Sequence, residues 1–562
     1  MDFLIKFKKN LNLLVSIYVL VVACAKQGMP PGGPEDKLPP RVIETIPDSA
    51  AVQVPRDQRT IQFRFNENVQ PSALDAVFIT PYVDADIKYK LKGRELSITL
   101  PDSLLPNTTY VFTLGTGVRD YRNNALQQSF TLAFSTGDSL DGGHIFGRVA
   151  DLQDAKGVDV WAYQLQTDQL CNPITMTPDY IVQCAQNGDF NMIHMKAGNF
   201  RLFAVKDRVL NRLYDIAEDQ IGVGSHDICL SSENHFEYGP VFFKMSMEDT
   251  LSPRLLVANS VCQFQIQLRF DEPIQLSDSS LIVLNPVTDS SALDTVKYFY
   301  FEPQNVKMIR IIDSSLEANI SYQVHIESVY DLAGNAIIES DVEFENVSET
   351  DTTNPKLTRI QPKPKQRDVH PDSSIIFEFS EPMDTVHFSS HVMLSDTAER
   401  PLAYTYKWFN PAQVELCPLG GWPSSTICRV GIDSTVSDLS ENTLADTLFT
   451  FVSVNPDTLS EISGSIRRNG QYLESDLILH AIQLTKTPRV YQLFLPEAQT
   501  EFSFQKLMPG NYVVNGYYDL DHNGQYSYGS VWPYKPAEPY TQFPDTILAR
   551  SRWPNEGNQF KF

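Results

Sequence analysis

The sequence predicts an all-β protein built from several small β-sandwiches in tandem, and three observations lead to this fold class. The composition favours strands and turns over long helices, because 24 Tyr and 32 Phe accompany 27 Gly and 36 Pro. Several segments alternate apolar and polar residues with a period of two, which is typical of half-buried strands. Similar patterns also recur along the 562 residues, a length that corresponds to about four or five domains.

The clearest repeat occurs three times and has two parts. Each copy follows a Pro-rich opening with an alternating strand that ends in Phe-x-Glu. An Asp-x-x-x-Asn pattern and a closing strand come 53 to 59 residues after that Glu. The repeated positions are Glu67, Asp120 and Asn124 in residues 38–137, Glu272, Asp331 and Asn335 in residues 250–350, and Glu381, Asp438 and Asn442 in residues 351–455.

These positions resemble bacterial Ig-like domains of the S-layer-associated type, which show strand-Phe-x-Glu and Asp-x-x-Gly-Asn patterns. Residues 331–335, Asp-Leu-Ala-Gly-Asn, fit the second pattern best, whereas the other two copies lack its Gly. The resemblance implies an antiparallel β-sandwich for each of the three segments.

A second repeat relates residues 138–249 to residues 456–562. Both segments resemble transthyretin-like domains of the carboxypeptidase-regulatory type, which are small non-catalytic β-sandwiches. The matching positions are Phe190 and Phe502, Gly198 and Gly510, Asp207 and Asp519, Asn211 and Asn523, and Tyr214 and Tyr526.

The sequence therefore predicts five modules in a string. In chain order they are module 1 (38–137, Ig-like), module 2 (138–249, transthyretin-like), module 3 (250–350, Ig-like), module 4 (351–455, Ig-like) and module 5 (456–562, transthyretin-like).

Residues 1–23 are typical of an export signal, with three early lysines and a short apolar run over residues 11–22. Val21-Val22-Ala23-Cys24 resembles a lipobox, which implies cleavage before Cys24 and attachment of diacylglycerol and further acyl chains to its sulfur. Residues 24–37 are rich in Pro and Gly and form a tether. Their Pro-x-Gly-Gly-Pro sequence resembles the start of large Ig-like lipoproteins from Bacteroidetes-type bacteria. We expect an outer-membrane lipoprotein, with the cell surface slightly favoured.

Six cysteines remain after Cys24, and an even number in an exported chain favours disulfides. Proximity in sequence predicts the pairs Cys171–Cys184 and Cys417–Cys428, which leaves Cys229 with Cys262.

The repeated acidic residues have two interpretations. The Glu and Asp of each Ig-like copy can gather at one end of a sandwich and bind Ca²⁺, or the Asp and Asn can cap a tight turn. Capping is the favoured interpretation. A sharper calcium candidate follows residue 518, where Asp519, Asp521 and Asn523 supply oxygens at alternate positions before Gly524. The aromatic stretch from Tyr526 to Trp553 predicts either local packing or a surface for glycan or protein docking.

No nucleophile elbow, zinc-binding His pair or phosphate-binding Gly loop occurs in the sequence, so we expect no enzyme activity. The net charge of −24 argues against nucleic acid as a partner. The sequence favours a structural subunit that docks on an outer-membrane β-barrel or another membrane complex. The alternative is a cell-surface adhesin or glycan-binding protein.

Overall fold

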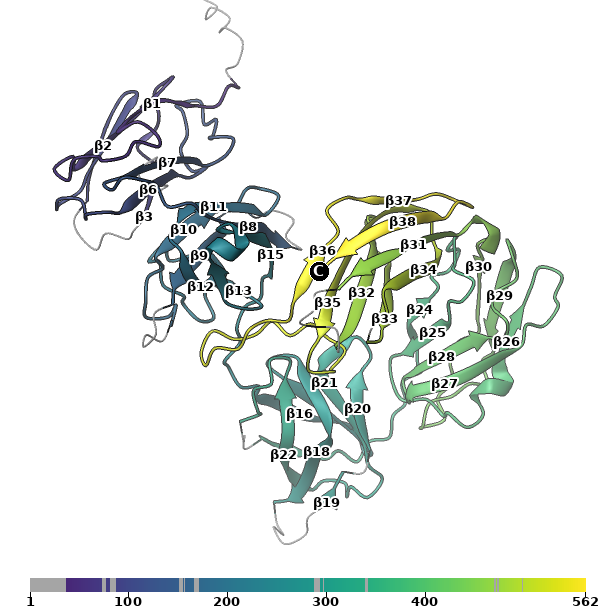
Figure 1. Cartoon of the computed structure of the whole chain (residues 1–562). Coiled ribbons are helices and arrows are strands. Elements are labelled where there is room, and N and C mark those ends of the chain that lie inside the picture. The colour runs from purple at the N-terminus through teal and green to yellow at the C-terminus, as the bar shows by residue number, and fades with distance from the viewer. Residues whose placement is uncertain are drawn as a thin grey trace, which may run out of the picture. The chain divides into compact units, whose positions relative to one another are not determined.

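The computed structural model describes residues 37–72, 77–80, 87–150, 155, 157–165, 171–287, 294–296, 298–338, 342–468, 472, 475–497 and 499–562. The chain divides into two compact units, Met1–Leu140 and Asp141–Phe562. Strands dominate the described residues and none of them lies in an α-helix, so the all-β prediction is confirmed (Figure 1).

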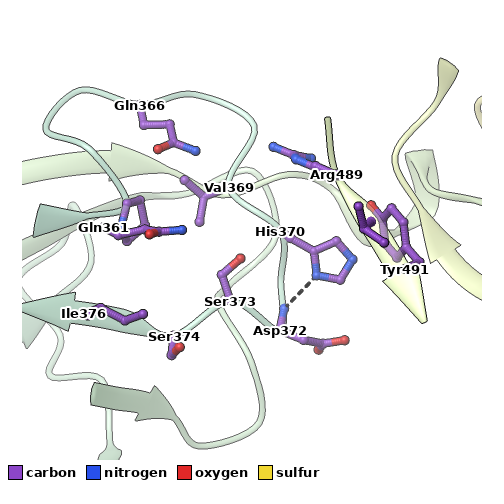
Figure 2. A pocket seen from close by; sticks show the side chains of 12 residues that line it. Gln361, Gln366, Val369, His370, Asp372, Ser373, Ser374, Ile376, Arg489 and Tyr491 are labelled. Atoms are coloured by element: carbon purple, nitrogen blue, oxygen red, sulfur yellow. Dashed lines mark hydrogen bonds between the residues drawn. The ribbon is translucent and has the colours of Figure 1, made fainter. Parts of the chain in front are cut away.

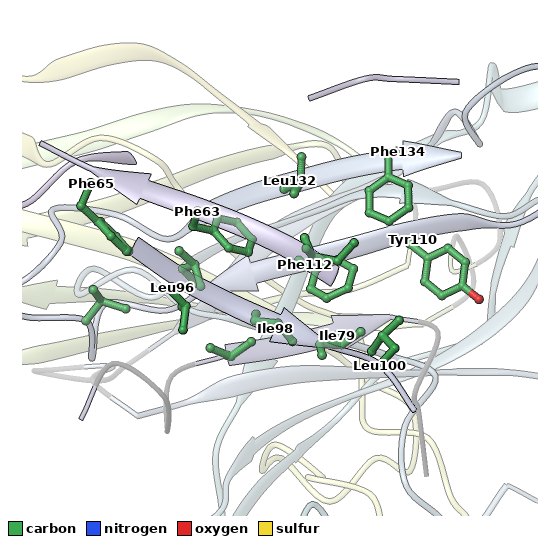
Figure 3. Packing of buried hydrophobic residues seen from close by; sticks show 14 of the residues in the cluster. Phe63, Phe65, Ile79, Leu96, Ile98, Leu100, Tyr110, Phe112, Leu132 and Phe134 are labelled. Carbon is green, nitrogen blue, oxygen red and sulfur yellow. The ribbon is translucent and has the colours of Figure 1, made fainter. Parts of the chain in front are cut away.

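Module 1 is a sandwich of two antiparallel sheets within the first unit. The first sheet has the order β1-β2-β5-β4 and the second β3-β6-β7. Alternate residues of β2, Ile61, Phe63 and Phe65, are buried against Phe112 and Phe134 of the facing sheet (Figure 3). The strands are β1 (Val42–Ile46), β2 (Thr60–Phe65), β3 (Val77–Thr80), β4 (Lys88–Lys92), β5 (Glu95–Thr99), β6 (Thr109–Leu114) and β7 (Phe130–Ser135).

Module 3 is also a two-sheet sandwich, with strand orders β16-β17-β21-β20 and β19-β18-β22-β23. The predicted alternating strand is β17, in which Ile266, Leu268 and Phe270 are buried. The strands are β16 (Leu255–Cys262), β17 (Gln265–Phe270), β18 (Ile274–Pro286), β19 (Asp294–Thr295), β20 (Phe299–Glu302), β21 (Asn305–Ile312), β22 (Ser321–Asp331) and β23 (Val342–Glu345).

Module 4 repeats the arrangement of module 1, with strand orders β24-β25-β28-β27 and β26-β29-β30. In all three of these modules the opening strand pairs with the Phe-x-Glu strand, which explains why that pattern recurs. The elements are β24 (Leu357–Gln361), β25 (Ile375–Phe379), the 3-10 turn η3 (Phe388–His391), β26 (Val392–Ser395), β27 (Tyr404–Asn410), β28 (Gln413–Pro418), β29 (Ile427–Ile432) and β30 (Thr447–Val452).

Module 2 combines a three-stranded sheet, β11-β8-β15, with a second sheet, β10-β9-β12-β13, in which β14 also pairs with β12. The elements are β8 (Gly143–Ala150), β9 (Asp159–Gln164), β10 (Tyr180–Gln183), β11 (Asp189–Met195), β12 (Gly198–Lys206), β13 (Gln220–Val223), β14 (Ile228–Leu230), the 3-10 turn η2 (Ser232–Asn234) and β15 (Glu237–Lys244).

Module 5 has the same topology, with sheets β34-β31-β38 and β33-β32-β35-β36, and β37 paired with β35. Its elements are η4 (Pro456–Thr458), β31 (Ser460–Arg467), β32 (Asp476–Gln483), β33 (Val490–Leu495), β34 (Glu501–Leu507), β35 (Gly510–Asp519), β36 (Tyr540–Gln542), β37 (Ile547–Ala549) and β38 (Asn555–Lys561).

Two glycines explain part of the second repeat. In each module the last strand runs parallel to the first, and it passes closest to the backbone at Gly147 or Gly464. A Cβ at Gly147 would overlap the carbonyl of Val241, and one at Gly464 would overlap the carbonyl of Asn558. Only glycine permits this approach of two backbones.

Modules 2 and 5 contact each other directly, although they are far apart in sequence. The segment 520–539 of module 5, here called the arm, packs on the outer face of the β9–β12 sheet of module 2. Val531 and Ala537 of the arm are 0% and 3% exposed. They share one hydrophobic cluster with Trp161 and Phe203 of module 2.

Polar contacts tie the arm to the same face. The backbone N–H of Val531 donates to the Glu248 carboxylate at 2.9 Å, and that of Ala537 donates to the Gly224 carbonyl at 3.3 Å. The Arg201 guanidinium lies 3.5 Å from the ring centroid of Tyr534, which favours a cation–π interaction. Apolar burial and directed contacts therefore join two modules that are far apart in sequence.

The predicted disulfides are not present in the structure, where all six cysteines after Cys24 are free. Cys184 belongs to the core between the two sheets of module 2, whereas Cys171 lies in the cluster on the outer face. Since these two clusters cover opposite faces of the β9–β12 sheet, the two thiols lie on different sides of it. Nearness in sequence was therefore a poor guide.

The other two predicted pairs fail for similar reasons. Cys428 is buried in the core of module 4, whereas Cys417 on β28 is exposed. Cys229 lies on β14 of module 2 and Cys262 on β16 of module 3, so the last pair would have to link two modules.

Candidate functional site

The Asp-x-x-x-Asn patterns form one tight turn in three places, as the capping interpretation predicts. At Asp331, one carboxylate oxygen accepts the backbone N–H groups of Ala333 and Asn335, each at 2.8 Å. The other oxygen accepts the side-chain amide of Asn335 at 2.7 Å. The same three contacts occur at Asp120 with Arg122 and Asn124, and at Asp438 with Ser440 and Asn442.

The Asn of the turn also holds the segment that leads into the module. The Asn335 amide donates to the backbone carbonyls of Asp249 and Leu251 at 2.9 and 3.1 Å. In module 4 the Asn442 amide donates to the Asp351 carbonyl at 3.0 Å. The repeated Asn thus fastens the incoming chain to the turn, a role that the sequence alone did not indicate.

Carboxylates converge beside two of these turns. Oxygens of Asp249, Glu272 and Asp331 lie within 4.8 Å of one another, and so do those of Asp351, Glu381 and Asp438. The sequence paired the Glu and the turn Asp correctly but missed Asp249 and Asp351. The sequence does contain a pattern that could have identified these two residues. Each Asp stands four residues before the opening proline of its module, Pro253 or Pro355.

Module 1 has the corresponding sequence but not a described triad. Asp36 stands four residues before Pro40, yet it lies outside the described residues. Within the described part of the chain, Glu67 accepts a hydrogen bond from the side chain of Asn66 at 3.2 Å.

The triads concentrate negative charge in partly buried positions. The pKa of Glu381 is raised to about 8, mainly by burial. A hydrogen bond with Asp351 and the negative charges of Asp351 and Asp438 act in the same direction. Burial and three neighbouring carboxylates likewise raise the pKa of Glu272. Either a proton or a cation relieves this repulsion, and oxygen-only donors suit a hard ion such as Ca²⁺.

The predicted calcium loop of module 5 contains a third triad, formed by Asp519, Asp521 and Glu538. Glu538 was not predicted, because it lies 19 residues after Asp519 instead of at the twelfth loop position. It accepts the N–H groups of Leu520 and Ser527 at 2.6 and 2.9 Å. Burial raises its pKa, and the charges of Asp521 and Asp519 raise it further.

Asn523 has another task in this loop. Its backbone N–H donates to the carboxylates of Asp519 and Asp521, both at 3.1 Å, and its side-chain oxygen accepts the N–H of Gln525 at 2.6 Å. The structure therefore brings together two of the three predicted ligands and assigns the third to the turn.

Most of the C-terminal aromatics pack inside the second unit. Tyr526, Tyr528 and Tyr540 surround the ammonium of Lys244 at 4.9, 5.8 and 5.1 Å from their ring centroids. Trp532 and Trp553 are more exposed, at 51% and 71%, than Tyr528 at 39%. These two remain available for docking.

The predicted lipid site, Cys24, lies outside the described residues together with the tether up to Asp36. None of the described segments forms a helix with the length and hydropathy that a membrane crossing requires.

Comparison with known families identifies part of the chain. Residues 36–136 and 351–453 match the family model of the bacterial Ig-like domain. These two segments are bacterial Ig-like domains. They correspond to modules 1 and 4, and the Ig-like domains thus account for two of the three segments that carry the Phe-x-Glu and Asp-x-x-x-Asn patterns.

Solved structures show only distant similarity. L,D-transpeptidase 1 of Mycobacterium tuberculosis is 11% identical over 36% of this chain and 99% of its own, with a TM-score of 0.18. The α-2-macroglobulin fragment of Escherichia coli is 14% identical over 34% and 71%, with a TM-score of 0.18. The N-terminal part of the bacterial S-layer protein SbsC is 10% identical over 36% and 44%, with a TM-score of 0.17.

Such low TM-scores carry no argument about activity. No curated protein matches the chain.

Proposed function

We propose that the chain is a non-catalytic scaffold subunit of an outer-membrane protein complex, held at the membrane by acyl chains on Cys24. The observation that carries the proposal is the packing of the arm on module 2, with Val531 fully buried. This contact makes modules 2 and 5 parts of one surface. A preformed surface lowers the entropy that is lost when a partner binds.

The signal sequence and the lipobox support the location. The anchor would place the chain next to membrane-embedded proteins, and a β-barrel or another membrane complex is the proposed partner. The cell surface stays the slightly favoured location.

A glycan-binding or adhesive role is the second candidate. It is favoured by Trp532 and Trp553, which are 51% and 71% exposed on the C-terminal module. Exposed tryptophan rings offer flat apolar faces on which sugar rings can stack.

Calcium is proposed as a structural ion at the three carboxylate triads. Asp519, Asp521 and Glu538 would hold it in module 5, and the two triads beside the Asp-Asn turns would hold it in modules 3 and 4. Bound Ca²⁺ would neutralise adjoining carboxylates and stiffen the loops that join the modules.

The test of the main proposal is purification of the tagged chain from outer membranes in mild detergent, followed by mass spectrometry. The proposal expects one membrane protein in equal amount. The Trp532→Ser/Trp553→Ser variant should retain that partner. Recovery of the chain alone, together with saturable binding on a glycan array that this variant loses, would replace the scaffold proposal with the glycan one.

The lipid anchor is tested separately with Cys24→Ser. This variant should leave the membrane fraction while its thermal unfolding midpoint stays unchanged. A Cys24→Ser protein that still sediments with carbonate-washed membranes would contradict the anchor.

A further inference from the structure

A polar cavity of about 440 Å³ lies where modules 4 and 5 meet. Module 4 lines it with the loop around Gln366, Val369 and His370, and module 5 contributes the start of β33 with Arg489 and Tyr491 (Figure 2). Both modules belong to the second compact unit. None of the calcium candidates takes part in this cavity.

Arg489 is the only described arginine that lines the cavity, and its guanidinium points into the gap between Gln366, Val369 and His370 (Figure 2). Its Nη2 donates to the backbone carbonyl of Asp368 at 3.1 Å. Its Nη1 is buried and has no hydrogen-bond partner among the described residues. A buried charged donor left unpaired is costly, so this group calls for an acceptor.

The neighbouring described polar groups do not accept a hydrogen bond from Arg489 Nη1. The Asp372 carboxylate is engaged by the Lys506 ammonium at 2.6 Å. The His370 ring donates through Nε2 to the Lys506 carbonyl at 2.9 Å and accepts the Asp372 N–H at Nδ1. Both ring nitrogens of His370 are therefore engaged, and the ring joins the two modules without accepting a hydrogen bond from Arg489.

The loop of module 4 at the rim of the cavity has more basic than acidic side chains, although the chain as a whole carries a charge of −24. Residues 361–370, the loop at this rim, hold three basic side chains and one acidic side chain, the exposed Asp368. The three basic residues, Lys363, Lys365 and Arg367, are exposed beside the lining residues Pro362 and Gln366. Such a local field attracts anions to the opening.

We propose that this cavity binds an oxyanion, a phosphate or carboxylate group, through Arg489, whose guanidinium turns away from the Asp368 carbonyl and toward the bound group. The planar guanidinium fork matches two oxygens of such a group. The Ser373 hydroxyl and the Gln361 amide line the same space and can contribute further hydrogen bonds. The group can come from a soluble molecule or from a lipid headgroup at the membrane surface.

The test uses the full mature chain with Cys24→Ser, so that acyl chains on Cys24 cannot cause membrane binding. Calorimetric titration at low ionic strength uses sodium phosphate and, separately, sodium citrate. Saturable binding of at least one is expected. Arg489→Gln should weaken it by about tenfold or more, because a charge-assisted pair of hydrogen bonds is lost. The affinity of Arg489→Lys should lie between those of the parent and Arg489→Gln, because lysine keeps the charge but lacks the planar guanidinium.

Arg429→Gln is the matched control, since Arg429 lies in module 4 outside the cavity and pairs with exposed Glu399 at 3.4 Å. It should bind as the parent does. If Arg489→Gln fails to fold, Ser373→Ala removes a lining hydroxyl and should weaken binding by a smaller factor. Absence of saturable binding of both anions, or equal affinity of the parent, Arg489→Gln and Ser373→Ala, would overturn the proposal.

Vesicles identify the source of the group. Sedimentation with phosphatidylglycerol vesicles but not with phosphatidylcholine vesicles, lost in Arg489→Gln, would assign the cavity to a headgroup. Binding of the free anion without vesicle binding would assign it to a soluble ligand. Vesicle binding that Arg489→Gln leaves unchanged would contradict a headgroup in this cavity.

Discussion

Modules 2 and 5 share their topology and their turn residues, but the loop after the long central strand serves different ends. In module 2, 13 residues separate β12 from β13, and this loop packs on its own module through its buried Tyr214. In module 5, 20 residues separate β35 from β36, and they form the arm that covers module 2. A few additional residues in one copy have turned a surface loop into a contact between modules.

The two loops also differ in how their carboxylates are arranged. Asp207 and Asp219 accept backbone N–H groups in module 2, and Asp519 and Glu538 do so in module 5. Module 5 adds Asp521 where module 2 has Val209, and among the described residues of the two modules a carboxylate triad occurs only in module 5. Module 2 is therefore a natural control for both the arm and the triad.

The largest expected effect is at Val531. Val531→Asp places an unpaired charge in the apolar contact and should lower the free energy of unfolding by about 3 kcal/mol or more. Val209→Asp, at a 56% exposed position of the module 2 loop, should change it by less than about 0.5 kcal/mol. Urea unfolding measures both, and equal effects would mean that the arm does not dock.

The next effect concerns the turn carboxylates. Asp519 is 4% exposed and accepts the N–H groups of Asn523 and Gly524, so Asp519→Ala should cost about 2 kcal/mol. Asp207 is more exposed, and Asp207→Ala should cost about 1 kcal/mol. Thermal unfolding in a chelator measures the difference. Added Ca²⁺ should stabilise the parent and Asp207→Ala more than it stabilises Asp519→Ala.

The triad of module 4 tests the same charge logic through pH. The pKa of Glu381 is about 8 in the folded chain against an ordinary value of 4.5. The native state therefore keeps a proton that the unfolded state releases, and stability falls as pH rises between these values. In the presence of a chelator, Glu381→Gln should make the free energy of unfolding less dependent on pH. At pH 8 this variant should be more stable than the parent by about 1–2 kcal/mol, a value that allows for partial solvent screening.

Glu399→Gln is the control for this pH profile, because the Glu399 side chain is 82% exposed. It should leave the pH dependence unchanged. A profile for Glu381→Gln that superimposes on the parent would mean that the triad is not coupled to folding.

The smallest effect is a change in the reactivity of the cysteine thiols. In the native parent, a thiol reagent should modify the exposed Cys229 and Cys417 and spare the buried cysteines. Burial raises the pKa of Cys171 to about 12, and this thiol lies in the cluster under the arm. Val531→Asp should therefore expose one further reactive thiol, Cys171. Cysteines that stay unreactive even after denaturation would indicate disulfides.

The sequence predicted those features that depend on local patterns. Alternation located the strands with Phe63, Ile266 and Phe377, and the repeated Asp-Asn spacing located three turns, because both follow from backbone geometry within one module. The sequence also predicted that Glu272 lies near Asp331, since the Phe-x-Glu strand and the turn recur together.

Contacts between elements far apart in sequence were not predictable in this way. The packing of Val531 on Trp161 joins two modules, and no periodicity encodes it. Glu538 approaches Asp519 only because the arm returns to the sheet. The cysteine pairs failed because sequence proximity does not tell which side of a sheet a thiol faces.

The contact between Arg201 and Tyr534 gives the most direct test of the claim that module 5 closes on module 2. The two residues lie 3.5 Å apart, guanidinium to ring centroid, across the two modules. A double-mutant cycle with Arg201→Ala and Tyr534→Ala, measured by urea unfolding, should give a coupling free energy of about 1–2 kcal/mol. Additive effects of the two substitutions would contradict the closed arrangement and leave the modules as independent beads.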